Sequence, residues 1–429
     1  MEKAASSPGA PTVAPLDGIT VLELSQIMAG PVCGLLLSDM GADVIKVEKF
    51  PHGDDARGYS RPGDLGLSPA FVMLNRGKRS VALDLRHPAG REALLKLARS
   101  ADVITENFRV GAMERLGLGY EELKAVNPKL IYCGISGYGR TGPLALQGGF
   151  DLILQAFSGI ISVTGTEDGT TVKPGISVGD VNAGILAALG VLAAYIQRLK
   201  TGKGARVDTS LLQACMQQTY WFAAAYFSQG IVAKPMGTAH SLIAPYQTFR
   251  CKDGVIAVGG GNQTNWERIA TVLGHPEWVE DARFGNGSQR LAHRLELVAL
   301  MTGVLETDTV ANWESRLAKA GVPVGPVQNI DQALNHSQVK AVGMVIENLD
   351  DRAGVDKAIG CPIHFNDESP TRRGRAPLVG EHTGDVLLSF GFSDAEVRAL
   401  IDINAAFQPK PDTNFGAVPQ ARTRDSELA

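Results

Sequence analysis

The chain has 429 residues, more than a single hydrophobic core usually takes up, so two domains or one domain with a large insertion are expected. Its 41 basic and 45 acidic residues leave a net charge of -4, which excludes a general attraction to nucleic acid or to an anionic membrane. We therefore expect neither as a partner, and a composition with 44% hydrophobic and 20% charged residues is typical of a globular protein.

Metal and disulfide patterns are missing from the sequence. The five cysteines are scattered without a C-x-x-C pair, and the eight histidines form no H-x-x-x-H or H-E-x-x-H motif, so neither a disulfide framework nor a metal site is predicted. This cysteine usage favours a reducing compartment, the cytoplasm or the mitochondrial matrix of a eukaryote. The longest apolar run, Ala183–Ile196, is shorter than the roughly 20 residues that span a bilayer and is interpreted as a core helix.

The chain begins with residues 1–14, which lack the apolar segment of a signal peptide and are predicted to be a flexible arm. Short β-branched runs then alternate with helical segments, which is typical of parallel βαβ units with helices on both faces of the sheet. A long helix over 179–200 follows, and Gly202 is suited to close it. The strands are predicted at 19–24, 44–48, 81–85, 103–107 and 130–136. These elements predict a large α/β domain over 15–229.

The pattern changes at about residue 230. Strands over 246–249 and 255–258 precede a mainly helical stretch over 266–319, which predicts a smaller α+β domain over 230–327. Helical spacing returns at Leu378–Leu400, so residues 328–408 are predicted to rejoin the large domain. The polar segment 409–429 is predicted to be a loose tail.

Asp180 stands where the long helix begins. An aspartate at such a place usually caps the helix, but the same helix end favours an ionised carboxylate, and an accessible carboxylate can act as a nucleophile. The residues alone leave both interpretations open. Gly175–Gly179 has the letters G-x-S-x-G of a hydrolase elbow around Ser177, but five letters are a weak signal and a coincidental loop is favoured.

Two charged or aromatic segments lie next to predicted strands. Asn75–Ser80 places three cations before a strand, near the edge where open α/β sheets bind ligands, although a solvated charged turn explains it equally. Glu106-Asn107-Phe108 and Arg115 follow the next strand and offer an amide, a ring and a cation to a nucleotide. Gly259–Gly261 does not match G-x-G-x-x-G and is interpreted as a plain turn.

In their order, these segments resemble the family III CoA-transferases, which include formyl-CoA transferase, carnitine CoA-transferase and the α-methylacyl-CoA racemases. The resemblance covers the chain from Leu16 to about Leu400. The motifs that carry it are Leu16-Asp17-Gly18, Ala29-Gly30-Pro31, residues 41–48 (GADVIKVE), Asn75–Ser80, Glu106-Asn107-Phe108, Gly137-Tyr138-Gly139, Gly179-Asp180, Thr201–Gly204, Gly321-Val322-Pro323, Gly325-Pro326, Ala376-Pro377-Leu378 and Gly380–Thr383.

The resemblance implies a Rossmann-like large domain with a mostly parallel sheet, a small domain and a homodimer of interlocked rings. It implies no tightly bound cofactor, with coenzyme A and acyl-CoA as substrates. The family's catalytic aspartate falls on Asp180. CoA is then expected along Gln26, Ile27, Met28, Ala29, Lys49, Met73, Leu74, Asn75, Lys78, Arg79, Asn107, Phe108, Arg115 and Tyr138.

Two departures from the family pattern narrow the function. Racemases carry a histidine in Gly-His-Asp, and here Gly149-Phe150-Asp151 lacks that base. Where formyl-CoA transferase has a four-glycine loop, this chain has Met236 followed by the expected substrate and oxyanion loop, Gly237, Thr238, Ala239 and His240. The loop and the Pro-Tyr-Gln that follows are most similar to transferases that move CoA from succinyl-CoA to dicarboxylates such as glutarate.

The predicted function is thus transfer of CoA from an acyl-CoA, succinyl-CoA, to a small carboxylic acid such as glutarate, through aspartyl anhydride and aspartyl-CoA thioester intermediates. Itaconate, citramalate, mesaconate and oxalate remain open as acceptors. His240 is expected either to bind the acceptor's distal carboxylate or to tie its own loop together. The alternatives are an acyl-CoA racemase or epimerase, a non-catalytic CoA-binding protein, and a thioesterase that uses Ser177.

Overall fold

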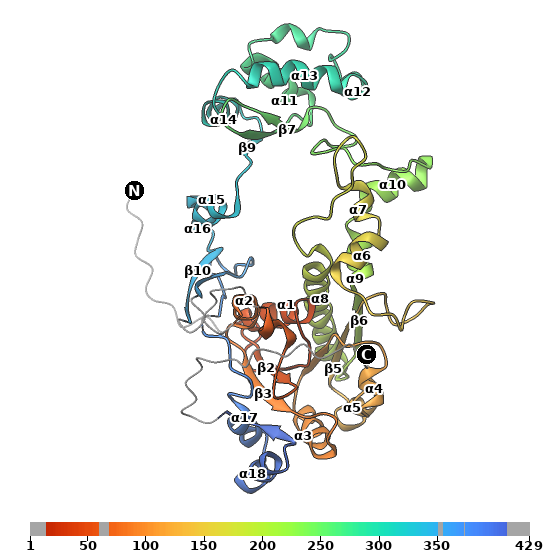
Figure 1. The fold of residues 1–429 in the computed structure, drawn as a ribbon, viewed down its shortest axis with the longest axis vertical. Coiled ribbons are helices and arrows are strands. Elements are labelled where there is room, and N and C mark those ends of the chain that lie inside the picture. Colours follow the sequence, from red (N-terminus) through yellow and green to blue (C-terminus); the bar gives the residue numbers. More distant parts are fainter. Residues whose placement is uncertain (1–13, 60–67, 351–354, 373, 410–429) are drawn as a thin grey trace. The chain divides into compact units, whose positions relative to one another are not determined.

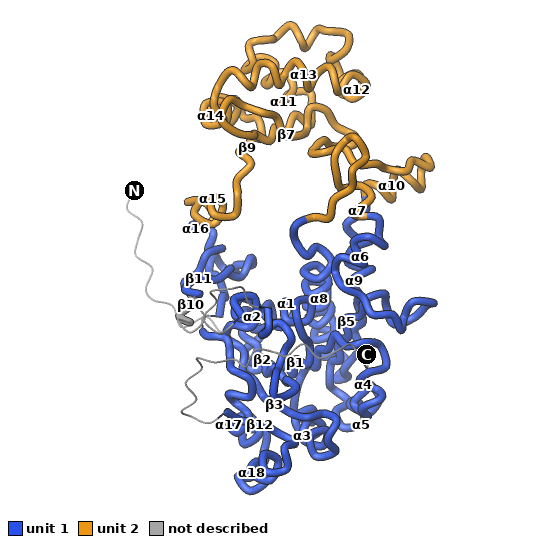
Figure 2. Tube along the Cα trace, viewed as in Figure 1, with its two compact units in different colours: residues 1–159, 175–220, 340–429 blue, residues 160–174, 221–339 orange. Residues whose placement is uncertain are grey.

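The computed structural model describes residues 14–59, 68–350, 355–372 and 374–409. Apart from Ala14 and Pro409, the predicted arm and tail lie outside these residues. The chain forms two compact units (Figure 2): a large unit of residues 1–159, 175–220 and 340–429, and a small unit of residues 160–174 and 221–339. The small unit contains the predicted small domain, 230–327, and it also includes 160–174, 221–229 and 328–339, which the sequence placed in the large domain.

The large unit is built on a seven-stranded sheet in the order β12-β3-β2-β1-β4-β5-β6. All neighbours are parallel except β12, which pairs antiparallel with β3 at the edge. The strands are β1 (Thr20–Glu23), β2 (Asp43–Glu48), β3 (Arg79–Leu83), β4 (Val103–Glu106), β5 (Ile131–Ser136), β6 (Arg206–Ser210) and β12 (Ala406–Phe407). A separate antiparallel pair is formed by β10 (Val345–Asp350) and β11 (Val355–Ile359).

Helices cover both faces of the large sheet, as predicted (Figure 1). On one face, Leu22 and Val81 pack against Leu94 of α3 and Val386 of α17. On the other face, α1 and α8 pack on the strands, and they approach so closely that a Cβ on Gly184 would lie 2.5 Å from the Ala29 carbonyl oxygen. The helices of this unit are α1 (Ala29–Asp39), η1 (Asp55–Gly58), α2 (Pro69–Asn75), α3 (Pro88–Ala98), α4 (Ala112–Arg115), α5 (Tyr120–Val126), α6 (Asp151–Phe157), α8 (Val178–Thr201), α9 (Leu211–Gln217), α17 (Thr383–Ser389) and α18 (Asp394–Asp402).

Helix α8 extends well beyond the apolar run predicted at its centre. In the part of the chain that the structure describes, it is the one helix whose length and composition would suffice to cross a membrane. It packs against α1, α9, β5 and β6 within the large unit. Its other side carries a stripe of exposed apolar side chains, Ile185, Leu189, Ile196 and Leu199.

The small unit combines a three-stranded antiparallel sheet, in the order β7-β8-β9, with helices. Three of the chain's four tryptophans, Trp266, Trp278 and Trp313, are buried in its core, and the fourth, Trp221, also belongs to this unit. Its elements are α7 (Ile160–Val163), β7 (Tyr246–Arg250), β8 (Val255–Gly259), α11 (Gln263–Val272), η2 (Pro276–Val279), α12 (Gly287–Ala292), α13 (Arg294–Leu305), α14 (Val310–Lys319), β9 (Val324–Pro326) and α15 (Ile330–Asn335), while α10 (Tyr220–Gln229) and α16 (Ser337–Ala341) cross the unit boundaries.

Candidate active site

The direction in which strands are added to the large sheet reverses at β1, because β2 and β4 lie on its two sides. In open α/β sheets, ligands bind outside the carboxyl ends of the strands at such a point. The loops after β1 and β4 meet there: the side chain of Asn107 accepts a hydrogen bond from Gln26 N at 2.8 Å and donates one to Gln26 O at 2.8 Å. The two loops therefore form one continuous surface at the switch point.

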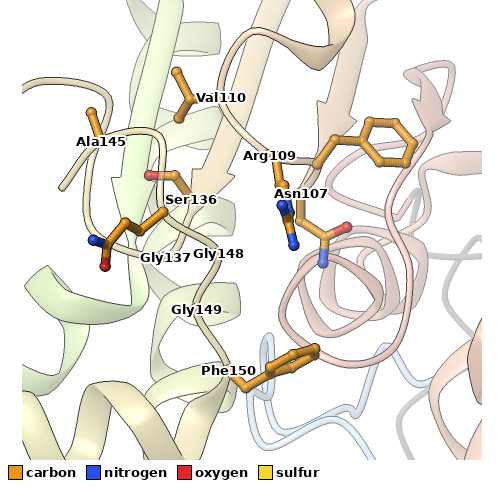
Figure 3. A pocket seen from close by; sticks show the side chains of 11 residues that line it. Asn107, Arg109, Val110, Ser136, Gly137, Ala145, Gly148, Gly149 and Phe150 are labelled. Atoms are coloured by element: carbon orange, nitrogen blue, oxygen red, sulfur yellow. The ribbon is translucent and has the colours of Figure 1, made fainter. Parts of the chain in front are cut away.

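Two pockets flank this point. The first has a volume of about 180 Å³ and lies after β4 and β5, where Asn107 and Arg109 form one wall and Phe150 another (Figure 3). The second, of about 220 Å³, lies after β1, β2 and β3 and includes Gln26 and Lys49. Phe108 lines both pockets. Each is smaller than the roughly 300 Å³ at which sites for drug-sized ligands begin, so either pocket alone would hold only part of an acyl-CoA.

The residues predicted to contact CoA have unequal access to solvent. Lys49 and Arg115 are exposed, and Ala29 is buried at the start of α1. Tyr138 packs edge-on against Phe157 at a centroid distance of 5.4 Å. The other predicted contacts, apart from Asn75 and Lys78, are half-buried: Gln26, Ile27, Met28, Met73, Leu74, Arg79, Asn107, Phe108 and Tyr138.

Asn75 and Lys78, which were also predicted to contact CoA, are both buried, and their contact with CoA stays a prediction. Lys78 Nζ donates to Glu23 Oε2 at 2.8 Å and to Asn75 Oδ1 at 2.9 Å. Arg76, another cation of the same segment, is buried against Asp39. Lys78 and Arg76 are neutralised by acids of β1 and α1. Among the three cations of this segment, only Arg79, which pairs with Asp43, is partly exposed. The position of this segment was predictable from the sequence, but the buried acids that pair with its cations were not.

A buried ionic network supports the loop after β1. Lys46 Nζ lies 2.9 Å from Glu23 Oε1 and 2.9 Å from Asp54 Oδ2, and Asp54 Oδ1 accepts a hydrogen bond from Ile27 N at 2.9 Å. Although burial opposes its charge, the carboxylates of Glu23 and Asp54 raise the pKa of Lys46 above its ordinary value. Burial lowers the pKa of Lys78 to about 8.

The network holds a strained residue. Ile27 has a φ of 67°, which is unfavourable for a β-branched side chain. Such strain persists where the surrounding structure fixes it, and it is commonly found at ligand-binding positions. The hydrogen bond that the Ile27 amide donates to Asp54 thus connects the buried ionic network to the loop that borders the second pocket.

Asp180 is the third residue of α8 and is half-buried. Its carboxylate has no hydrogen bond or ion pair with any residue in 14–59, 68–350, 355–372 or 374–409, so it does not cap the helix. The cap comes from α6: Asp151 Oδ1 accepts hydrogen bonds from Gly179 N at 2.8 Å and Asp180 N at 3.4 Å. Burial, with a further contribution from the Asp151 charge, raises the pKa of Asp180 to about 6.

The hydrolase elbow around Ser177 does not form. Helix α8 begins at Val178, one residue before its predicted start, and the Ser177 side chain makes no capping hydrogen bond. Among the described residues, those between α7 and Ser177 contribute no strand to any sheet, whereas an elbow requires a strand directly before the serine. The letters G-x-S-x-G are thus a coincidence of sequence.

In the small unit, three of the four amides of the loop Gly237–His240 are hydrogen-bonded. Gly237 N, Ala239 N and His240 N donate to backbone carbonyls, and Thr238 N is the one amide of this loop with no partner among the residues that the structure describes. His240 Nδ1 accepts a hydrogen bond from Leu242 N at 3.1 Å, and its ring packs on Tyr246 at 5.4 Å. His240 therefore ties its loop together. A role of the loop toward an oxyanion stays a prediction, and Thr238 N is the donor available for it.

Asp180 lines neither pocket, but Asp151, which accepts hydrogen bonds from the first turn of its helix, directly follows Phe150 of the first pocket. A half-buried carboxylate fits acyl transfer, and the comparison with known proteins decides the family. The sequence profile of CoA-transferase family III matches residues 16–383. The chain belongs to CoA-transferase family III. This membership implies acyl-CoA as the substrate.

Relatives of this family III enzyme differ in their substrates. It is 35% identical to the succinyl-CoA:glutarate CoA-transferase of Mus musculus, over 87% of this chain and 86% of that protein. It is also 35% identical to the acetyl-CoA:oxalate CoA-transferase of Acetobacter aceti, over 89% and 97%. A crystal structure of a CaiB/BaiF family protein from Brucella suis is 37% identical and superimposes with a TM-score of 0.78, covering 88% of this chain and 99% of that one. The family III assignment is thus firm, while donor and acceptor vary.

Sequence reasoning missed several residues at the site of this family III enzyme. Asp151 was noted only for its neighbour Phe150, and no pattern connected it with the first turn of α8, 28 positions later. Arg109 of the first pocket and Arg86 of the second follow β4 and β3. A cation placed shortly after a parallel strand was the available signal for these two, and guanidinium groups suit phosphates.

Proposed function

We propose that this family III enzyme transfers CoA from succinyl-CoA to a free dicarboxylic acid such as glutarate, with Asp180 as the nucleophile. The observation that carries the proposal is the Asp180 carboxylate: it stands at the amino end of a 24-residue helix and is released from capping by Asp151. The resemblance of the loop around His240 to glutarate-type transferases, and the similarity to the mouse enzyme, support the choice of substrates.

In the proposed first half-reaction, an Asp180 carboxylate oxygen attacks the thioester carbonyl carbon. The C–S bond breaks, CoA leaves as a thiolate, and a mixed anhydride forms. The thiolate then attacks the aspartyl carbonyl carbon, and the donor acid leaves as a carboxylate, so that an aspartyl-CoA thioester remains. The acceptor carboxylate repeats these steps in reverse. Because one thioester replaces another, no ATP is needed to drive the exchange.

An acceptor screen tests the substrates. The protein is incubated with succinyl-CoA and, separately, glutarate, oxalate, mesaconate, itaconate or citramalate, and mass spectrometry detects the new acyl-CoA. We expect glutaryl-CoA to form fastest. Preferred formation of another acyl-CoA would correct the acceptor, and the absence of any would contradict the proposed transfer. Release of free CoA without an acceptor would instead indicate a thioesterase.

Hydroxylamine tests the covalent intermediate. Added together with succinyl-CoA, it should cleave the aspartyl thioester and leave a hydroxamate, which peptide mass spectrometry locates at position 180. The control omits succinyl-CoA, since an unactivated carboxylate does not react. A hydroxamate at any other residue, or none during active transfer, would contradict the mechanism.

Transfer should decline as the pH falls through about 6, the raised pKa of Asp180. Above this pH the carboxylate is ionised and nucleophilic, and below it the neutral acid cannot attack. An unperturbed aspartate would remain ionised down to about pH 4. The half-reaction, read as release of succinate without acceptor, avoids titration of the acceptor acid. A rate that stays constant down to pH 5 would contradict this assignment.

The exposed Phe150 makes racemisation a poorer alternative, because a phenyl ring stands where racemases place a base. Exchange of the acyl α-proton with deuterated solvent, without acceptor, would indicate that activity.

We also propose a homodimer in which a second chain covers the apolar stripe of Ile185, Leu189, Ile196 and Leu199. The five cysteines are free and buried, which supports a reducing compartment.

A further inference from the structure

Helix α8 has an unusual amino end. The first amides of a helix need acceptors, which the residue before the helix commonly supplies from its side chain. Ser177 occupies that place and makes no such bond. Asp151, the first residue of α6, supplies the acceptor instead, with Oδ1 at 2.8 Å from Gly179 N and 3.4 Å from Asp180 N.

The capping carboxylate is itself fixed. Gln155 Nε2 donates to Asp151 Oδ2 at 2.6 Å and to the Ile176 carbonyl oxygen at 3.3 Å, so it connects the cap to the segment that leads into α8. Asp151 and Gln155 are both buried. Gly179 leaves room for this contact, because a Cβ there would lie 2.9 Å from Cys215 Sγ and 3.1 Å from Asp151 Oδ1.

In a capping box, the residue before the helix bonds the amide of the third helical residue, whose acidic side chain in turn reaches back to the amide of that first partner. Asp180 is the third residue, but Ser177 makes no such bond and Asp151 has taken its place at the Asp180 amide, so the reciprocal pair with Ser177 does not form. We propose that Asp151 is a positioning residue for Asp180: by capping α8 from the neighbouring helix, it leaves the Asp180 carboxylate free to attack an acyl group. This inference rests on the proposed role of Asp180 as nucleophile.

Besides burial, the charge of Asp151 influences the charge state of Asp180. Asp151 of α6 is a like charge nearby, and burial together with this charge raises the pKa of Asp180. From α9, Cys215 presents a thiol that stays neutral because burial raises its pKa. Helix α1 meets α8 at Gly184 through Ala29 and Val32, which do not titrate. A more basic carboxylate that is still ionised at neutral pH is the stronger nucleophile.

Asp151→Asn separates charge from capping in the full-length protein. The new side chain keeps an oxygen for the two amides. Its NH₂ group would face Gln155 Nε2, and once the Gln155 amide rotates it can donate to Gln155 Oε1, a buried atom with no partner in the described part of the chain. We expect the titration midpoint of Asp180 to move down by about one pH unit, and the acid limb of succinate release to move with it. Carbon-13 NMR of aspartate-labelled protein measures the midpoint directly, and the signal is assigned by its loss in Asp180→Asn.

Asp151→Ala removes the cap as well, so Asp180 can turn onto its own helix. We expect kcat to fall at least about tenfold while the KM for succinyl-CoA stays within about twofold, because the pockets at the switch point are untouched. The matched control is Ser393→Ala, which removes the cap of α18 in the same unit and should leave kcat unchanged.

The two variants can overturn the inference separately. An Asp180 midpoint that is the same in Asp151→Asn and in the natural protein would do so, and so would a kcat in Asp151→Ala no lower than in Ser393→Ala. Should Asp151→Ala fail to fold, Asp151→Asn and its titration still decide. The absence of CoA transfer by the natural protein would contradict the proposed function. The NMR titration needs no turnover, so the titration midpoint of Asp180 would still test the influence of Asp151.

Discussion

Asp180→Ala should abolish CoA transfer, with kcat reduced at least about 10⁴-fold, as is found when a catalytic nucleophile is removed. The structure assigns this carboxylate no other task, since Asp151 caps the helix in its place. Acyl-CoA should still bind, because the two pockets at the switch point remain. Steady-state rates measure the first effect, and calorimetric titration with succinyl-CoA measures the second.

The fold offers a closely matched control for this substitution. Asp385 is the third residue of α17 in the same unit, it follows a glycine, and it is exposed. Asp385→Ala thus loses the same favourable placement of an acid near a helix start without touching the site, and its kcat should equal that of the natural protein. Appreciable transfer by Asp180→Ala, or an equal loss in Asp385→Ala, would rule out Asp180 as the nucleophile.

Glu23→Ala should lower the free energy of unfolding of the large unit by about 3–5 kcal/mol, the usual cost of leaving buried charges unpaired. Glu23 is fully buried and holds both Lys46 and Lys78 at 2.9 and 2.8 Å. A Cβ on Gly34 of α1 would overlap the Glu23 carboxylate, so this helix fits closely over the acid. Its removal leaves the buried Lys78 ammonium without a carboxylate partner and Lys46 with Asp54 alone, and it opens an empty space between helix and sheet.

The distribution of tryptophans makes this effect measurable for one unit at a time. All four tryptophans belong to the small unit, so their fluorescence should be the same in Glu23→Ala and the natural protein. Amide hydrogen exchange in β1, β2 and β3 reports on the large unit and should accelerate about 10²- to 4 × 10³-fold. The control, Glu121→Ala, breaks an exposed pair with Lys124 and should change exchange little. Unchanged exchange in Glu23→Ala would contradict the structural role of the network.

The sequence predicted the central strands because their apolar runs are bounded by polar residues, and β1, β2, β4 and β5 lie within about a residue of their predicted positions. Strand β3 was predicted two residues late, at 81–85 instead of Arg79–Leu83, because its first residues are polar. Arg79 pairs with Asp43 and Ser80 Oγ donates to Glu48 Oε1, so both find partners within the sheet. Local hydrophobicity could not report these pairings.

The site was predictable where its parts are close in sequence. The place of Asp180 at a helix start and of Asn107 after a strand follow from local patterns. Whether a polar residue faces a ligand depends on partners far away: Lys78 is turned inward by Glu23, 55 positions earlier, and Asp180 is freed from capping by Asp151. Such contacts depend on the tertiary packing, which spacing along the chain does not encode.

The closing strand β12 has a consequence for synthesis on the ribosome. Ala406 pairs with Leu83, and Ala405, Val386 and Leu387 share one core with Leu22 and Leu94. The amino-terminal strands therefore emerge long before the residues that cover them, whereas most of the small unit is one continuous stretch, 221–339. The small unit can fold while translation continues. The amino-terminal strands cannot complete their core until the carboxyl-terminal residues have been synthesised, and chaperones can shield these strands until then.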